Sequence, residues 1–409
     1  MKSVLMKSGG VGLSVSLNRG PYQNNGASPW YAFVGVGTPA QTLKFSFDTG
    51  SNFIWATSSL CHPETCHHYG DQQFVYQISS SFSWVNQHTT DVNFGPWGNM
   101  DVKTGNDVFT LTPESLGRME NGSVSLSSDL YLAESYQGTQ FRELDWDGGI
   151  GIPSTNDRSD FSSLGQPYRG MTPQRGSEAA SFHFFQSLVE QGIVSAKRPY
   201  VTFLTDIDSE SGQVEFGQLN QDYRDSREYL FLPWQSYSIP SVSYIWTSQL
   251  TSLSVGDKVL IHEGKSLTPY FFSLDSGSSQ FKGDPKIMNE VFSLTSKNGQ
   301  DVIIELGKTD RNENGRLVVP SSIYDVLIEH GEDRGKTISQ FSPLDGLDNL
   351  VLVGSVLMDY LYTVYEYEII SFGSESRIKP VGMWIFNKLN GPKIITSTQG
   401  KPAKIFHIL

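Results

Sequence analysis

The chain has 409 residues, a formal net charge of −13 at pH 7 and a sequence pI of about 5.1. Hydrophobic residues make up 38% and charged residues 18% of the chain, a composition that predicts a folded soluble protein and excludes a disordered one. The acidic balance excludes nucleic acid as the main partner, because neutralising phosphates needs clustered Lys and Arg.

The sequence carries no clear targeting or membrane signal. No run in the sequence approaches the ~20 apolar residues of a membrane span. The apolar stretch at the start is shorter than a secretory core of about 7–15 residues. We therefore expect no membrane span, and a cytoplasmic protein if the chain is complete. A secreted or periplasmic protein is expected if a targeting segment has been removed.

The first chemically informative segment follows a strand predicted at Trp30–Gly37. An apolar run at residues 45–47 leads into Asp48, Thr49, Gly50 and Ser51. Glycine allows a tight bend with no Cβ in the way, so backbone N–H groups can point at the carboxylate. Ser51 is placed to donate its hydroxyl to that carboxylate, and Thr49 is placed to bond to a second, similar turn.

The only two cysteines are Cys61 and Cys66, which have histidines beside them. This spacing suits a small disulfide loop, two free thiols, or half of a zinc site. A structural zinc site usually needs a second ligand pair, and none is evident. The three histidines of this segment, His62, His67 and His68, are interpreted as solvated loop residues.

The middle of the chain predicts short strands with few helices. Residues 62–93 and 153–180 are polar and rich in Gly and Ser, and we interpret them as loops or insertions. Apolar spacing predicts a helix at Ser181–Gln191 and a second at Ser321–Glu329. Further strands are predicted at Tyr200–Leu204, Gln213–Gly217, Tyr229–Pro233, Val302–Leu306, Arg316–Pro320 and Tyr362–Tyr367.

A second copy of the first turn appears in the other half of the chain. An apolar run at residues 271–274 leads into Asp275, Ser276, Gly277 and Ser278. Each copy is followed later by an apolar segment containing Gly, at residues 147–153 and 350–355, which suits buried strands close to another backbone. This internal repeat predicts two related lobes, residues 1–206 and 207–409.

Two carboxylates presented by matched turns can perform acid–base chemistry. Within about 3 Å of each other they cannot both ionise, so the pair shares one proton. The ionised member can take a proton from water while the protonated member polarises a carbonyl group. A single turn of this kind is weak evidence, but two copies behind matching strands predict Asp48 and Asp275 as a catalytic pair.

These residues resemble those of the pepsin-like aspartic peptidases, peptidase family A1. The resemblance runs from about residue 28 to residue 390 and includes both turns. Trp55, seven residues after Asp48, matches the family's tryptophan beside the flap, and Cys61 and Cys66 match its small disulfide loop. Further matching segments lie at residues 31–41, 211–217, 302–306, 316–320, 352–354 and 362–365.

The resemblance implies an all-β, bilobal fold with a cleft between the lobes and few short helices. It implies an aspartic endopeptidase with an acidic pH optimum that binds a polypeptide in extended form and prefers apolar residues around the cleaved bond. No cofactor and no metal are implied, and a monomer is expected. The flap lies in a stretch where the best match is Phe94, Gly95 and Trp97, with Phe94 in place of the family's tyrosine.

Other features depart from the family pattern. Glycines at residues 148–149 stand where a larger apolar residue is common, which predicts looser support behind Asp48. The small number of cysteines, with neither a signal nor a basic pro-segment evident, is most similar to bacterial members. The alternative function is a non-catalytic binding protein on the same fold. A glycosidase with two carboxylates would not need matched Asp-x-Gly-Ser turns.

Overall fold

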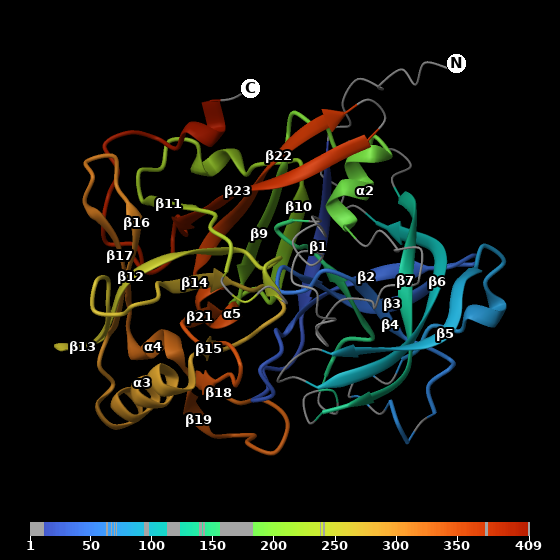
Figure 1. The fold of residues 1–409 in the computed structure, drawn as a ribbon, viewed down its shortest axis with the longest axis horizontal. Coiled ribbons are helices and arrows are strands. Elements are labelled where there is room, and N and C mark those ends of the chain that lie inside the picture. Colours follow the sequence, from blue (N-terminus) through green and yellow to red (C-terminus); the bar gives the residue numbers. More distant parts are fainter. Residues whose placement is uncertain are drawn as a thin grey trace.

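The computed structural model describes residues 12–62, 64–66, 68, 70, 72–93, 98–112, 123–138, 141, 144–155, 183–237, 239, 242–372 and 375–407. Figure 1 shows two lobes, with the first half of the chain on the right and much of the second half on the left. The fold is mostly β, as the sequence predicts. No helix in the described ranges is long and apolar enough to cross a membrane.

A long sheet connects the two halves of the chain. Its strands lie in the order β11-β23-β22-β9-β10-β1-β2-β3-β8-β4-β7-β6-β5. They are β1 (Leu13–Arg19), β2 (Trp30–Val36), β3 (Gln41–Asp48), β4 (Ile54–Thr57), β5 (Ser83–Asn93), β6 (Asn99–Leu111), β7 (Val124–Gln137), β8 (Gly148–Gly151), β9 (Tyr200–Asp206), β10 (Ser211–Phe216), β11 (Tyr229–Pro233), β22 (Leu361–Phe372) and β23 (Glu375–Asn387).

A second sheet belongs to the C-terminal half and lies in the order β17-β16-β12-β14-β21-β15-β20, with β13 paired to β12. These strands are β12 (Thr247–Val255), β13 (Lys258–His262), β14 (Tyr270–Leu274), β15 (Phe281–Gly283), β16 (Val302–Lys308), β17 (Asn314–Val319), β20 (Phe341–Pro343) and β21 (Leu350–Val353). A small pair consists of β18 (Asp325–Leu327) and β19 (Thr337–Ser339).

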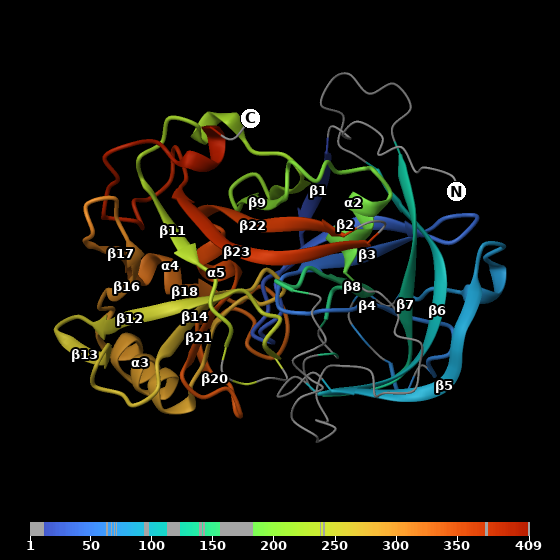
Figure 2. The ribbon, with the colours of Figure 1, turned by 45° about the horizontal axis from the view of Figure 1, so that its top comes forward.

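Four short or medium α-helices lie within the described residues: α2 (Phe184–Glu190), α3 (Pro285–Asn298), α4 (Ser321–Tyr324) and α5 (Ser355–Met358). Three 3₁₀ turns accompany them, η1 (Tyr76–Ile78), η4 (Gln221–Tyr223) and η6 (Lys404–His407). Figure 2 shows α3 beside the second sheet and α2 near one end of the paired strands β22 and β23.

Alternation of buried side chains explains the strands near the site. In β3, Leu43, Phe45 and Phe47 are 3%, 0% and 2% exposed, because every second side chain of a strand points to the same face. β2 pairs antiparallel with β3 and buries its own alternate residues Ala32 and Val34. This packing holds the strand that ends in Asp48.

Several sequence predictions are wrong in detail. The helix expected at Ser321–Glu329 is only α4, because residues 325–327 pair with β19. Residues 83–93 form β5, which pairs antiparallel with β6. The prediction of a loop over residues 62–93 is therefore wrong for this part. The longest helix, α3, was not predicted. The remainder of the expected insertion, from residue 156 to residue 180, lies outside the described residues.

The division into residues 1–206 and 207–409 stays a proposal. Its boundary falls in the turn between β9 and β10, which are neighbours in the long sheet. β1 from the beginning of the chain pairs with β10, and β22 from near the end pairs with β9. The strands between the lobes therefore come from both ends of the chain.

Candidate active site

Both predicted turns stand at the end of a strand with the same kind of support. β3 ends at Asp48 and runs parallel to β8, with Asp48 opposite Gly151. β14 ends at Leu274, immediately before Asp275, and runs parallel to β21, with Leu274 opposite Val353. The two later apolar segments that the sequence singled out are therefore the strands beside the two turns.

The two turns bind their own carboxylates in the same way. The N–H of Gly50 donates to Asp48 Oδ1 at 2.8 Å, and the N–H of Gly277 donates to Asp275 Oδ1 at 2.9 Å. The Ser278 hydroxyl donates to Asp275 Oδ2 at 2.8 Å. Asp275 is only 4% exposed, whereas Asp48 keeps more of its surface accessible.

The two carboxyl groups face each other across the lobes, with each turn's glycine against the opposite carboxyl. A Cβ on Gly50 would lie 2.6 Å from Asp275 Oδ1, and one on Gly277 would lie 2.3 Å from Asp48 Oδ1. Real Cβ atoms do not approach that closely, so only glycine lets the two carboxyls meet. The repeated glycine of the motif therefore has a geometric reason.

Burial, followed by the neighbouring Asp275 carboxyl, raises the pKa of Asp48 well above its usual range. The Gly50 N–H and the Ser51 hydroxyl stabilise the ionised form and oppose this rise in pKa, without cancelling it. Two adjacent carboxyls of this kind cannot both be ionised, so they titrate as one coupled pair.

Thr49 and Ser276 lock the two turns together. The N–H of Thr49 donates to Ser276 Oγ at 3.0 Å, and the N–H of Ser276 donates to Thr49 Oγ1 at 3.0 Å. Each hydroxyl then donates to a carbonyl of the opposite strand: Thr49 to Leu274 O at 3.0 Å and Ser276 to Phe47 O at 2.6 Å. This near-symmetric exchange fixes one aspartate relative to the other.

Three aromatic residues that sequence reasoning did not assign to the site lie close to this exchange. The Tyr365 hydroxyl donates to Leu274 O at 3.2 Å. The Trp246 indole donates to Ile152 O at 3.0 Å, and its ring packs edge-on against Tyr365 with centroids 5.1 Å apart. Burial, and then the charges of the two aspartates, raises the pKa of Tyr244. Tyr365 lies in a segment that matches the family, whereas no local motif marks Trp246 and Tyr244 in the sequence.

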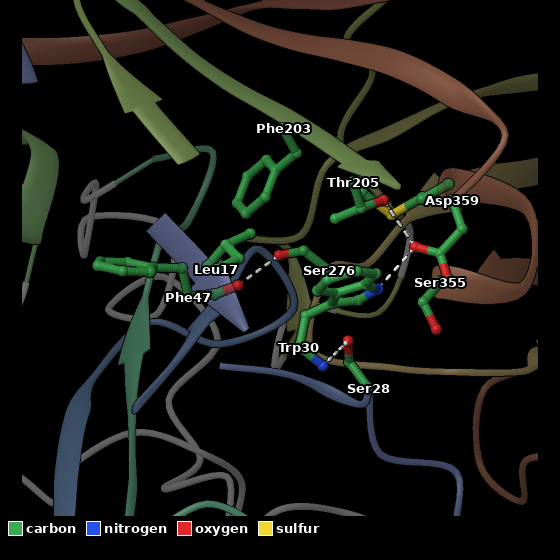
Figure 3. Close-up of a pocket in the computed structure, with 10 residues that line it drawn as sticks. Leu17, Ser28, Trp30, Phe47, Phe203, Thr205, Ser276, Ser355 and Asp359 are labelled. Atoms are coloured by element: carbon green, nitrogen blue, oxygen red, sulfur yellow. Dashed lines mark hydrogen bonds between the residues drawn. The ribbon is translucent and has the colours of Figure 1, made fainter. Parts of the chain in front are cut away.

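A cavity of about 20 Å³ lies beside Ser276, between strands of both halves. Figure 3 shows Trp30 and Thr205 directed at the Asp359 carboxylate on the wall of this cavity. Both donate to Asp359 Oδ1 at 2.7 Å. Burial raises the pKa of Asp359 to about 6.

Trp55 lies in β4, opposite Gly149 of β8, the strand that also pairs with the Asp48 strand β3. It is 5% exposed, and its ring packs edge-on against Phe141 with centroids 6.4 Å apart. A Cβ on Gly149 would lie 2.7 Å from Trp55 Nε1, so the indole occupies the space that a larger residue would fill. The looser support predicted from the glycines at 148–149 is therefore wrong.

Cys61 and Cys66 form a disulfide. The interpretation of His68 as a solvated loop residue is wrong, because its side chain is 2% exposed. Its Nε2 lies 3.0 Å from Asp147 Oδ1, and its Nδ1 lies 2.9 Å from the Tyr136 hydroxyl. This buried contact ties the disulfide loop to the residue that precedes β8.

The predicted flap residues Phe94, Gly95 and Trp97 lie outside the described residues. The strands on either side, β5 and β6, pair antiparallel up to Asn93 and Asn99. Among the residues that the structure describes, no group of three or more His, Cys, Asp or Glu side chains is placed to hold a metal ion.

Comparison with known proteins gives the class of the chain. The family model for eukaryotic aspartyl proteases matches residues 29–374. Pepsin A of Bos taurus is 23% identical over 361 residues, covering 85% of this chain and 83% of the bovine protein. Vacuolar protease A of Neurospora crassa is 22% identical, covering 85% of this chain and 78% of the fungal protein.

Plasmepsin IX of Plasmodium falciparum is 30% identical over 136 residues, which are 32% of this chain and 20% of that protein. The matched part therefore spans about one fifth of Plasmepsin IX, whereas the match to bovine Pepsin A extends over most of both chains. The chain belongs to the eukaryotic aspartyl protease family.

Proposed function

We propose that this chain hydrolyses peptide bonds by general acid–base catalysis between Asp48 and Asp275. The observation that carries the proposal is the meeting of two carboxyls from opposite halves, each held by its own glycine N–H. The raised pKa of Asp48 supports a pair that shares one proton. The family membership supports the same chemistry.

In this mechanism the pair shares one proton, and we assign the acid role to Asp48 and the base role to Asp275. Asp275 accepts a proton from a bound water as the water oxygen attacks the peptide carbonyl carbon. Asp48 donates its proton to the carbonyl oxygen, which gives a tetrahedral diol. Asp275 then gives its proton to the leaving nitrogen while one hydroxyl of the diol returns a proton to Asp48, which re-forms the carbonyl, breaks the C–N bond and restores the pair. The Gly277 N–H and the Ser278 hydroxyl support an ionised Asp275.

We further propose that the substrate is a polypeptide bound in extended form, with apolar side chains around the cleaved bond. The proposed lid is the segment that connects β5 and β6, with Phe94, Gly95 and Trp97 over the cleft and Trp55 beside it. The exposed part of Asp48 supports access to the pair from solvent. We expect the protein to act as a monomer without a cofactor.

The test is cleavage of casein and of one apolar peptide across a range of pH. A pair that shares one proton predicts a bell-shaped profile on the acid side of neutrality. Asp48→Asn and Asp275→Asn are each expected to lower kcat by about a thousandfold or more, because the pair acts as a unit. A rate that peaks above about pH 8 contradicts this mechanism.

Asp284→Asn is the matched control. Asp284 is also buried, but it caps α3 by accepting from the N–H groups of Lys286 and Ile287. Asparagine caps a helix nearly as well as aspartate, so the control should keep full activity. A wild-type protein that binds a statine-type peptide but cleaves nothing would instead identify a non-catalytic binding protein.

A further inference from the structure

A buried lysine lies next to the proposed pair and takes no part in the mechanism above. Lys282, in β15, is 2% exposed. Its Nζ donates to the carbonyl of Gly26 at 2.5 Å and to Ser278 Oγ at 3.4 Å. Ser278 in turn donates to Asp275 Oδ2 at 2.8 Å. The two contacts in series keep the ammonium within about 6 Å of the carboxylate, close enough for a strong Coulomb interaction.

The charges that act on this ammonium come from the pair itself. Burial lowers the pKa of Lys282 to about 8, and Asp275 and then Asp48 oppose that fall. Lys282 therefore remains a cation at the acidic pH where the proposed reaction runs. Its neighbours across the sheet are Leu352 of β21 and Ser342 of β20, neither of which titrates in this range.

The carbonyl that Lys282 binds belongs to the opposite half of the chain. Gly26 O also accepts from the N–H of Ser279 at 3.0 Å, and the N–H of Ser28 donates to Gly277 O at 2.9 Å. The segment around Gly26 thus lies along the second turn, and Lys282 completes its hydrogen bonding. Burying an ammonium is costly unless it is paired in this way, so its presence needs a reason.

We propose that Lys282 is a positioning residue for the pair: it holds the Ser278 hydroxyl on Asp275 and supplies a fixed positive charge that favours the ionised form of Asp275. This inference rests on the proposed function. A nearby cation lowers both apparent pKa values of the pair. Lys282 therefore shifts both limbs of the activity profile toward lower pH and keeps Asp275 ready to accept a proton from water.

The experiment compares pH profiles of kcat/KM on one peptide for the wild type, Lys282→Met and Lys282→Arg. Methionine keeps most of the length of the side chain and removes the charge, so both limbs should move up by about 1–2 pH units. Arginine keeps the charge, so its limbs should stay within about 0.3 unit of the wild type. Lys388→Met is the control, because Lys388 donates to the Thr205 carbonyl and acts mainly on Asp359.

The outcomes separate the two proposals. An inactive wild type refutes the proposed function. An active wild type whose limbs do not move in Lys282→Met refutes the role of Lys282, even if overall activity falls, because a structural role alone lowers activity without shifting the profile. If Lys282→Met does not fold, Lys282→Gln and Lys282→Arg are compared. Equal shifts in those two variants, or an equal shift in Lys388→Met, refute the charge argument.

Discussion

Replacing Ser276 by alanine tests the lock between the two turns most directly. The change removes one oxygen, which accepts from the N–H of Thr49 and donates to the carbonyl of Phe47. Both partners belong to the first half of the chain, at its buried turn, where Thr49 is 0% exposed. Ser276→Ala therefore leaves a buried donor and a buried acceptor without a partner.

The expected cost follows from those two groups. Each buried polar group left unsatisfied costs about 1–3 kcal/mol, so the variant should lose about 2–6 kcal/mol of unfolding free energy. That is a large share of the about 5–15 kcal/mol that stabilises a typical folded protein. Since the same bonds set the distance between the aspartates, kcat/KM should fall at least about tenfold, because small misplacements are costly in catalysis.

The assay is urea unfolding, followed by tryptophan fluorescence and by residual peptide cleavage. Ser273→Ala is the matched control: Ser273 is 1% exposed, lies three residues earlier, and has no hydrogen-bond partner for its hydroxyl. It should not lower the unfolding free energy, because no hydrogen bond is lost and the hydroxyl that is removed is itself an unsatisfied buried group. Ser276→Thr keeps the hydroxyl beside the cavity and should stay close to the wild type. Equal losses in Ser276→Ala and Ser273→Ala would refute the reasoning.

Three further predictions concern groups away from this lock. Burial raises the pKa of Asp359 to about 6, so its ionisation opposes folding as pH rises from about 4 to about 6. Asp359→Asn keeps an oxygen for Trp30 and Thr205, and urea unfolding should show it gaining up to about 3 kcal/mol over the wild type at neutral pH but little at pH 4. His68→Ala should lower the unfolding free energy by about 2–4 kcal/mol in thermal or urea unfolding, because a buried, hydrogen-bonded ring is lost. Phe94→Ala should lower kcat/KM several-fold in steady-state kinetics, whereas Phe94→Tyr should keep or raise it.

Each of these has an outcome that contradicts it. A parallel pH dependence of stability in the wild type and Asp359→Asn would show that this carboxyl does not titrate in that window. A change below about 0.5 kcal/mol in His68→Ala would restore the interpretation of a solvated loop histidine. If Phe94→Ala is silent while Trp97→Ala is not, Trp97 is the lid residue.

The sequence predicts the geometry of the two turns, because the signal there is local. In both turns the hydrogen bonds to the carboxylate come from residues close by in the sequence, as the bond from the Gly50 N–H to Asp48 shows. The strands beside the turns are also predicted, because residues 350–353 form one continuous apolar run and residues 147–151 combine Gly with Ile. Helix α3 has local signals too: Asp284 caps it, Pro285 begins it, and Gly299 ends it in the left-handed region at φ 56°. These signals are local, so the sequence alone is sufficient to predict this helix.

Features that depend on distant partners were not predictable. Lys282 stands between Phe281 and Gly283 in the sequence, and its partner Gly26 is 256 residues away. Trp30 and Asp359, which bond directly, are 329 residues apart. His68 looks like part of a polar loop until Asp147 is placed beside it. A single sequence does not predict such contacts, because the burial that strengthens them exists only in the folded protein.

The exchange between Thr49 and Ser276 has a consequence for biosynthesis. Each half delivers one aspartate, and the carbonyl that each hydroxyl needs belongs to the other half. Domains emerge from the ribosome in order, so the first lobe exists for some time without the second. Under the proposed mechanism a half-made chain has one carboxyl, no shared proton and no capacity to cut its neighbours. Under this mechanism the chain gains proteolytic activity only after its second half has folded against the first. The division of the pair between the two halves therefore delays activity until synthesis is nearly complete.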